Sequence, residues 1–350
     1  MLRPPMDRPD LRSPLALLAA LLVLGVVAVA AGCGSGGVGD LPLAAEPPRS
    51  PVPAHEPAGR VLPLDGEPEG IVADPVTGLL AIGLRKPAGL ALVDGRDGEV
   101  RRTVALPGRP RHLTLARPGG PVLVPAEPAN TFFSVGLPSG RVLQRVRVGA
   151  YPHDLTALAG GAYAVGDERG NTLSVVREGR VARRIPIATQ PGGVTTIDDG
   201  RTLAIVSVRE RVLELYDART LRRTGRAPAE VGPTHVACVK RAWCYVLDTQ
   251  GGALLVFQRG PDLELVRRLY LPGGPYGIAL DAEHGRLFVT LPARNEVVEL
   301  PAHGRPHVLR RWPTVRQPNS VAVDPVTRRV YVAGLQPSAL QVLSAAAPLR

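Results

Sequence analysis

The chain has 350 residues with a net charge of +11, 45% hydrophobic residues and only 4% aromatic residues. This hydrophobic content suffices for a packed core, which Ala, Val and Leu must fill because aromatic side chains are scarce. Lysine occurs only at Lys86 and Lys240, so the basic charge is almost wholly arginine, as a GC-rich coding bias produces. The lack of aromatic residues for base stacking argues against a nucleic-acid partner.

The first 33 residues are a predicted targeting segment. Three arginines within the first 12 residues precede an uninterrupted apolar run over residues 15–31, which Ala30-Ala31-Gly32-Cys33 closes. Small residues before a cysteine at the end of such a run resemble the lipobox of bacterial lipoproteins. The resemblance implies a lipoprotein signal peptide over residues 1–32, cleavage before Cys33 and lipidation of its sulfur. The alternative is an uncleaved signal anchor, because 17 apolar residues approach a minimal membrane span.

Both alternatives place the rest of the chain outside the cytoplasm, and we expect it on the outer face of the bacterial cytoplasmic membrane. Residues 33–58 contain many glycines and prolines and no apolar periodicity. Such composition predicts a flexible to extended tether that holds the following domain off the membrane.

A proline motif repeats seven times along the remainder of the chain. Each tag is a proline, two mostly polar or small residues and a branched apolar residue, and successive prolines are 42, 42, 39, 42, 42 and 43 residues apart. A period of about 40 residues with short strands is typical of a β-propeller. The tag prolines are Pro68, Pro110, Pro152, Pro191, Pro233, Pro275 and Pro318.

Each repeat predicts four short strands separated by turns, with no helical period, so the fold class is all-β with seven four-stranded antiparallel blades over residues 59–350. The last repeat supplies only three strands before the chain ends. The segment from Arg60 to Gly66 resembles the fourth strand that precedes the second tag. We therefore expect this N-terminal strand to complete the last blade and close the ring, which removes open sheet edges.

The first and last repeats share the words Asp74-Pro75-Val76-Thr77 and Asp324-Pro325-Val326-Thr327, and Arg329-Val330-Tyr331-Val332-Ala333 follows in the last. These words resemble the YVTN-type propeller repeats of bacterial exported and surface-layer-like proteins, over about residues 59–350. The resemblance implies the propeller fold and leaves the function open, because such propellers bind many things and some similar ones are enzymes.

The residues that follow each tag proline are the candidates for a functional site. In a propeller the innermost strands line the central channel, so we expect these residues to converge on one mouth of it. The candidates for ligand binding are Arg111, His112, His153, Asp154, His235, Tyr276 and Asn319, and the candidates for catalysis are His112, His153, Asp154, His235 and Glu69.

Three of the chain's seven histidines fall in this set. Neutral imidazoles beside a carboxylate can bind a transition metal or act as acid and base. The alternative is structural, since polar residues at tight turns often hydrogen-bond the backbone of their own or the neighbouring blade. His112 and His235 share one offset from their prolines while His153 lies one position earlier, so the three need not point at one spot. The sequence leaves the metal unknown.

Two further patterns concern the body of the propeller. Cys238 and Cys244 flank a short turn between two predicted strands, which in an exported protein favours a local disulfide over a pair of buried free thiols. Arginine pairs recur in the predicted fourth strands, which are outermost. They discourage edge-to-edge pairing of sheets, and they also suit an anionic envelope polymer.

The sequence therefore predicts a lipid-anchored extracytoplasmic propeller that acts as a binding or scaffold module, with its ligand at the channel mouth. A protein partner is the other expected kind of contact besides the membrane. The competing prediction is a metal-dependent enzyme of lyase or lactonase type that uses the same mouth. No cofactor is required for the first prediction, and a divalent metal is compatible with both.

Overall fold

The computed structural model of this protein describes residues 46–239 and 243–345. The predicted signal peptide, Cys33, the first part of the predicted tether and the turn at Arg241 lie outside these ranges. Within the described ranges no helix is long and apolar enough to cross a membrane.

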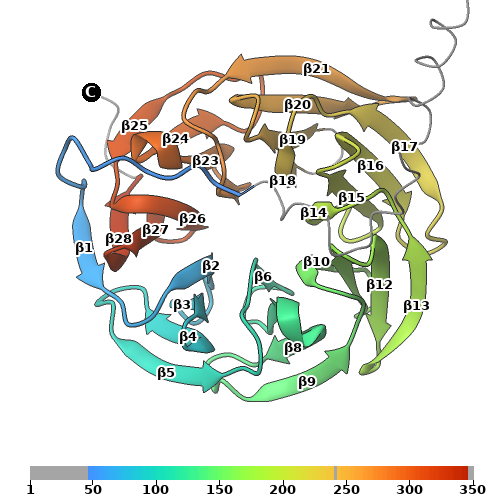
Figure 1. Ribbon diagram of the computed structural model, residues 1–350, viewed down its shortest axis with the longest axis horizontal. Coiled ribbons are helices and arrows are strands. Elements are labelled where there is room, and N and C mark those ends of the chain that lie inside the picture. The colour runs from blue at the N-terminus through green and yellow to red at the C-terminus, as the bar shows by residue number, and fades with distance from the viewer. Residues whose placement is uncertain (1–45, 240–242, 346–350) are drawn as a thin grey trace, which may run out of the picture. The chain divides into compact units, whose positions relative to one another are not determined.

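Seven four-stranded antiparallel sheets are arranged in a ring, which confirms the predicted all-β propeller (Figure 1). Blade one consists of β2 (Pro68–Ala73), β3 (Leu79–Arg85), β4 (Ala88–Asp94) and β5 (Val100–Ala105). Blade two consists of β6 (Thr114–Leu115), β7 (Val122–Ala126), β8 (Thr131–Val135) and β9 (Val142–Arg147), with the 3-10 helix η2 (Glu127–Ala129) between its second and third strands. Blade three consists of β10 (Pro152–Ala157), β11 (Tyr163–Asp167), β12 (Thr172–Arg177) and β13 (Arg180–Pro186).

Blade four consists of β14 (Pro191–Ile197), β15 (Thr202–Ser207), β16 (Val212–Asp217) and β17 (Arg223–Pro228). Blade five consists of β18 (Pro233–Val239), β19 (Trp243–Asp248), β20 (Ala253–Arg259) and β21 (Leu263–Tyr270). Blade six consists of β22 (Ile278–Asp281), β23 (Arg286–Leu291), β24 (Glu296–Pro301) and β25 (Arg310–Pro313), with η3 (Pro292–Arg294) after β23. Blade seven consists of β26 (Arg316–Asp324), β27 (Arg329–Gln336), β28 (Ser338–Ser344) and β1 (Arg60–Pro63).

The ring closes as the sequence predicted. Strand β1 pairs antiparallel with β28, with Arg60 opposite Val342 and Leu62 opposite Leu340. The outermost strand of the last blade therefore comes from the other end of the domain. This pairing covers the edge of β28, which would otherwise expose unpaired backbone groups.

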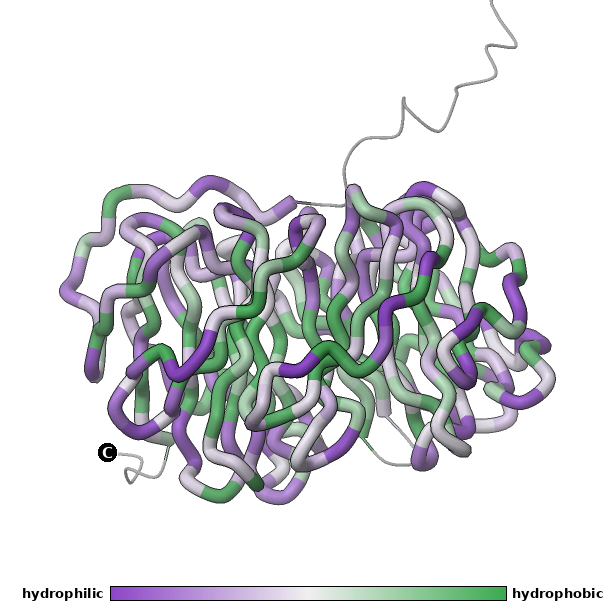
Figure 2. Tube along the Cα trace, turned by 90° about the horizontal axis from the view of Figure 1, so that it is seen from below, coloured by the Kyte–Doolittle hydropathy of each residue, from purple (hydrophilic) through white to green (hydrophobic). Residues whose placement is uncertain are grey.

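The core consists of apolar layers between neighbouring blades. Leu90 and Leu92 of blade one pack with Val124 and Phe133 of blade two, and all four are almost completely buried. Seen from the side, hydrophobic residues follow the strands while hydrophilic residues concentrate in the loops at the two faces (Figure 2). Small branched side chains suit these layers because sheets that radiate from one axis pack closely near the centre.

The fourth strands are outermost and largely exposed, as the arginine pairs predicted. Several of their arginines pair with acidic neighbours, including Arg311 with Glu296 at 2.8 Å and Arg268 with Glu230 at 2.8 Å. On blade five, a disulfide joins Cys238 and Cys244, which lie directly opposite each other in the β18–β19 pair.

From Glu46 onward the segment predicted as a flexible tether lies on the propeller. Ser50 is buried, its amide donates to the Gln317 side chain at 2.9 Å, and its hydroxyl donates to the Pro292 carbonyl at 2.5 Å. Asn295 donates to the Pro51 carbonyl at 3.0 Å. The segment crosses blades six and seven (Figure 1). Composition suggested mobility, but the backbone groups of this segment find side-chain partners on the propeller, and those partners hold it in place.

Candidate functional site

One face of the ring carries the tag prolines and the loops between the second and third strands of each blade; we call it the tag face. Asn130 and Asn171 end two of these loops with φ of 49° and 52°, a left-handed conformation that asparagine tolerates. Their side-chain oxygens accept hydrogen bonds from the amides of Tyr151 and Gln190, each of which precedes a tag proline. Each of these two loops thus fixes the start of the next blade's innermost strand.

The tags contain a bulge that the sequence did not reveal. In blade three the register shifts between Pro152 and Asp154, and in blade five it shifts between Pro233 and Val236. Such a shift inserts one extra residue and turns side chains relative to the regular alternation of a strand. Residues at different offsets from their prolines can therefore point at the same place.

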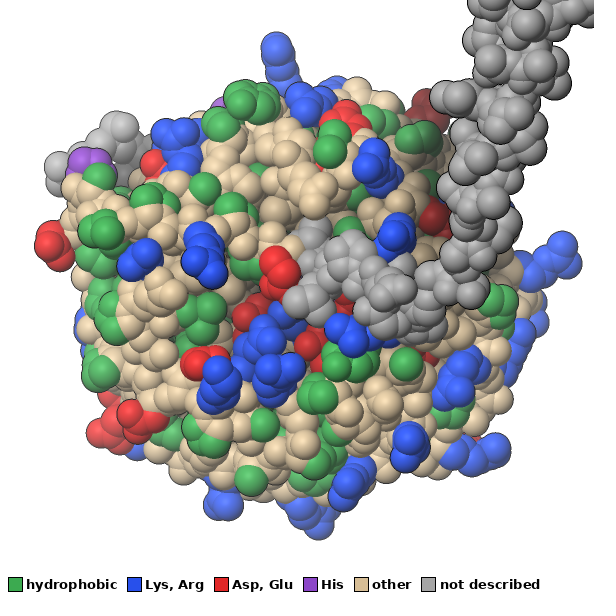
Figure 3. All heavy atoms as spheres, viewed as in Figure 1, with side chains coloured by type: hydrophobic (Ala, Val, Ile, Leu, Met, Phe, Trp, Pro, Cys, Tyr) green, Lys and Arg blue, Asp and Glu red, His purple; other side chains and the backbone are tan. Residues whose placement is uncertain are grey.

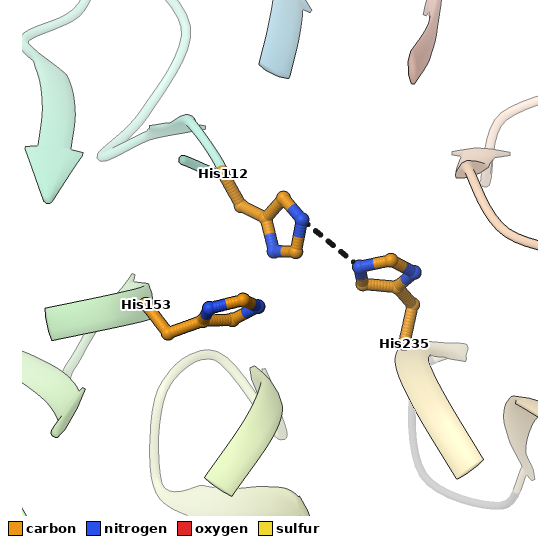
Figure 4. A group of neighbouring side chains, drawn as sticks. All are labelled: His112, His153 and His235. Atoms are coloured by element: carbon orange, nitrogen blue, oxygen red, sulfur yellow. Dashed lines mark hydrogen bonds between the residues drawn. The ribbon is translucent and has the colours of Figure 1, made fainter. Parts of the chain in front are cut away.

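The three tag histidines converge, although their offsets differ (Figure 4). The Nε2 atoms of His112 and His235 are 3.0 Å apart, and the ring centres of His112 and His153 are 4.7 Å apart. One ring nitrogen from each histidine lies within 4.8 Å of the others. The structure thus brings blades two, three and five together at a single point, which the sequence had left open.

His153 is held by two carboxylates from the tag face. Its Nδ1 lies 3.0 Å from Glu127 Oε1 and 3.3 Å from Glu168 Oε2, and Gln190 donates to Glu168 at 3.0 Å. Burial alone would lower the pKa of His153, but hydrogen bonds to Glu127 and Glu168 raise it to about 9. The same imidazole lowers the pKa of Glu168 to about 2 against the opposing effect of burial. His153 is therefore a cation between two anions at neutral pH.

His112 and His235 form a neutral pair beside this cation. Burial, followed by the charge of His153, lowers the pKa of His235 to about 3, and burial with the two neighbouring imidazoles lowers the pKa of His112 well below its usual value. His235 Nδ1 donates to the Tyr276 carbonyl at 2.6 Å, and the Tyr276 ring meets its edge. Two neutral imidazoles and one imidazolium thus share a space a few ångströms across.

Arg111 lies on the tag side of this cluster and is only 2% exposed. Its Nη2 donates to Glu46 at 2.9 Å and to the Tyr276 hydroxyl at 3.0 Å, and its Nε is 3.9 Å from Glu127. Glu69 is also buried and lies 3.6 Å from Arg85. A buried guanidinium requires compensating charge, and the carboxylates of Glu46, Glu69 and Glu127 supply it to Arg111.

Two predicted site residues, Asp154 and Asn319, line the same cavity as His112 and His235 and also make hydrogen bonds within the fold. Both oxygens of Asp154 accept backbone hydrogen bonds at 2.8 Å, from Leu155 and from Val194 in the next blade, while burial raises the pKa of this carboxyl to about 6. Asn319 accepts from the Gln317 side chain at 3.0 Å. Asp154 thus links two blades, while the Asn319 contact lies within β26.

A cavity of about 160 Å³ runs along the axis from the imidazoles. His112 and His235 line one end, and its wall consists mainly of the second to fourth residues after the tag prolines, among them Val194 and Thr195. Exposure increases along these strands away from the tags, as in β2 and β18. The imidazoles are therefore reached from the face opposite the tag face.

The predicted mouth at the tags is not an open one. Arg111, His153 and Tyr276 are nearly completely buried, and Glu46 of the N-terminal segment covers Arg111. A separate hollow of about 290 Å³ lies on the tag face beside Glu46; two predicted site residues, Glu69 and Asn319, line it, but no histidine does. Figure 3 shows acidic and basic side chains gathered at the middle of this face. Paired charges close the channel here, because each buried ion attracts a partner from a neighbouring loop.

Glu127, Glu168 and Glu46 belong to this arrangement but were not among the predicted residues. Glu127 and Glu168 follow the second strands of blades two and three, the blades whose tags carry His112 and His153. A comparison of equivalent loops across the seven repeats would have isolated these two glutamates, because no other blade has a glutamate at the first position after its second strand. Nothing in the sequence pattern indicates that Glu46 reaches Arg111.

No family model matches the chain, and no curated protein sequence does. Solved structures with the same fold include hydrazine synthase of Kuenenia stuttgartiensis, which has a TM-score of 0.70 and 17% identity over 84% of this chain and all of that one. Virginiamycin B lyase from Staphylococcus aureus has a TM-score of 0.69 and 16% identity over 82% of this chain and 99% of that one. The β-propeller domain of Cps50 (Swd1) from Myceliophteria thermophila has a TM-score of 0.69 and 14% identity, covering 83% of this chain and 99% of that one. At these identities the likeness concerns the fold alone.

Proposed function

We propose that this protein is a lipid-anchored, extracytoplasmic binding module whose ligand enters the central channel from the face opposite the tags. The observation that carries the proposal is the channel itself, whose wall combines branched apolar and polar side chains and includes the convergent imidazoles of His112 and His235. A concave cavity in which several polar groups converge is a common form of a small-molecule site.

The attachment of the chain favours this direction of access. Cys33, the proposed lipidation site, is 13 residues before Glu46, and 13 residues span at most about 45 Å when fully extended. Because Glu46 lies on the tag face, an anchor at Cys33 would hold this face toward the membrane. The open end of the channel would then face away from the membrane.

The channel restricts the class of ligand. Its volume of about 160 Å³ suits a small molecule or one narrow end of a larger one. Branched apolar side chains form much of the wall, while Thr114, Thr195 and the imidazoles offer hydrogen bonds. We therefore propose a ligand with an apolar body and a polar end group that meets the histidines.

A substitution that fills the channel tests this function. Thr195 lines the channel, whereas Thr103 lies exposed on the outermost strand of blade one. We expect the wild-type chain and the Thr103→Trp variant, purified from bacterial envelope extract, to carry the same small molecule in native mass spectrometry. The Thr195→Trp variant, with unchanged circular dichroism, should carry none. Absence of a bound mass from the wild type, or its retention in Thr195→Trp, would overturn the proposal.

An enzyme at the same place is the second candidate, favoured by the opposite charge states of the imidazoles. His153 has a pKa of about 9 and can donate a proton, whereas His235 has a pKa of about 3 and stays neutral. Groups whose pKa values are driven apart in one site suit general acid and base roles. Virginiamycin B lyase shares the fold, and one of its structures, a catalytically inactive variant, was determined with quinupristin. Conversion of the captured molecule by the wild type but not by His153→Gln would favour this candidate.

A further inference from the structure

The three converging histidines have an arrangement that a hydrogen-bonded structural cluster does not require. The Nε2 atoms of His112 and His235 are 3.0 Å apart, and a nitrogen of His153 lies within 4.8 Å of both residues' ligand atoms. Two imidazole nitrogens bound to one zinc ion, each at about 2.0–2.1 Å, are separated by roughly 3.3 Å. The observed spacing is therefore close to that of ligands around a shared cation.

The other ring nitrogens of His153 and His235 are held by fixed acceptors. His153 Nδ1 is held by Glu127 at 3.0 Å and Glu168 at 3.3 Å, and His235 Nδ1 by the Tyr276 carbonyl at 2.6 Å. Metal-binding histidines almost always donate their second ring N–H to a carboxylate or backbone carbonyl, which orients the ring and leaves the other nitrogen for the metal. Figure 4 shows the ring of His153 pointing toward the other two. His153 is a cation when no metal is bound, so it ligates only after its Nε2 has released a proton, while Nδ1 keeps its proton on the glutamates.

His112 differs from the other two histidines in the partners of its ring nitrogens. Its Nδ1 is buried and has no hydrogen-bond partner within the part of the chain that the structure describes. An unpaired buried nitrogen is costly, and protein structures rarely retain one without a reason. The only hydrogen-bond distance that the described residues give the His112 ring is therefore the 3.0 Å between its Nε2 and that of His235, so the ring lacks the fixed acceptor that holds each of the other two.

The surroundings suit a divalent cation with access from one side. Glu127 and Glu168 bring two carboxylates within 3.3 Å of His153, while Arg111 is matched by Glu46 and Glu127. The cavity that His112 and His235 line offers a route from the face opposite the tags. Imidazole ligands favour zinc, copper, nickel or iron over magnesium or calcium.

We propose that His112, His153 and His235 together bind one divalent first-row transition-metal ion, zinc in particular, at the inner end of the channel. The ion would face the cavity and could hold the polar end of a channel ligand. This role rests on the proposed function, whereas binding of the ion itself does not. Three protein ligands leave a coordination position for that ligand, as in zinc sites that take up water or substrate. The polar end group of the ligand is then one that coordinates a metal, such as a carboxylate.

The experiment measures metal binding by the full-length chain in mild detergent, without any channel ligand. After treatment with a chelator, the protein is titrated with ZnCl₂ by calorimetry and with CoCl₂ by visible absorption, and bound zinc is counted by mass spectrometry. We expect one ion per chain. His235→Ala and His112→Ala should lose it, and Glu168→Gln should weaken binding by roughly 10–100-fold. The matched control is His284→Ala, because His284 lies in blade six at a turn and outside the cluster.

The outcomes separate this inference from the proposed function. Less than about 0.1 zinc per folded chain, or unchanged zinc in His235→Ala and Glu168→Gln, would overturn the metal site. If His235→Ala fails to fold, Glu168→Gln decides, because it keeps the size of the side chain and leaves all three imidazoles in place. Zinc binding without a captured small molecule would support the metal site and reject the channel ligand. A captured small molecule in a chain that binds no zinc would reject the metal site and support the channel ligand.

Discussion

Replacing Arg111 with alanine should cost this protein several kcal/mol of stability. The guanidinium is 2% exposed, lies 2.9 Å from Glu46 and 3.0 Å from the Tyr276 hydroxyl, and is 3.9 Å from Glu127. Removing one partner of a buried ion pair leaves an uncompensated charge and typically costs about 3–5 kcal/mol. Glu127 is itself buried, so its carboxylate would lose part of its compensation.

The control is Arg311→Ala on the outermost strand of blade six. Arg311 lies 2.8 Å from Glu296, as short a contact as those of Arg111, but its side chain is 43% exposed. Exposed pairs contribute about 0–1 kcal/mol, because water and salt screen them. The two variants thus compare similar contact distances at different depths.

The assay is urea and thermal unfolding of both variants beside the wild type. For a domain of this size, a loss of 3–5 kcal/mol lowers the melting temperature by roughly 6–10 °C. We expect that shift for Arg111→Ala and a shift of at most about 2 °C for Arg311→Ala. Equal shifts in the two variants would refute the reasoning, since burial would then add nothing to the contribution of the charge.

Three further predictions concern other parts of the structure. Ser50→Ala should destabilise the docked N-terminal segment by about 1 kcal/mol, because the buried hydroxyl's hydrogen bonds to the Pro292 carbonyl and from the Gln317 amide are lost. Limited proteolysis should then cut faster near residue 50, and unchanged cleavage would contradict this docking. Replacing Cys238 and Cys244 with serine should lower the free energy of unfolding in urea by only about 2 kcal/mol, since the closed loop is short. An unchanged urea midpoint under oxidising conditions would contradict this prediction. In chelator-treated protein, the stability that His153 contributes should be complete below pH 6.5 and lost as the pH rises through about 9, because folding raises its pKa. The stability that His235 contributes should instead be lost as the pH falls from 6.5 toward about 3, because folding lowers its pKa. The urea midpoint of His153→Gln should lack the alkaline loss, and a wild-type midpoint that is flat between pH 7 and 9 would count against the raised pKa.

Repetition in the sequence was sufficient to predict the architecture. The spacing of the seven tag prolines predicted the number of blades, and the strand before the first tag predicted how the ring closes, both of which the structure confirms. These features depend on local periodicity and turn residues, which each repeat carries within about 40 residues. The same repetition located the innermost strands and therefore the histidines near the axis.

The composition of the site depended on contacts between repeats. His153 reaches His112 and His235 because a bulge redirects its tag, and Glu127 and Glu168 reach His153 from loops in blades two and three. The burial of Arg111 under Glu46 depends on a segment whose composition suggested a flexible tether. No local pattern encodes these side-chain directions, because each is determined by neighbours that are distant in sequence.

The sequence by itself thus determined a seven-bladed ring and the axial position of its polar residues. Tertiary structure alone decided that the tag side is closed, that the channel reaches the imidazoles from the opposite face, and that three histidines share one point. The physical reason is that strand formation follows from local periodicity, whereas burial, ion pairing and the convergence of imidazoles arise only when the seven blades pack around one axis.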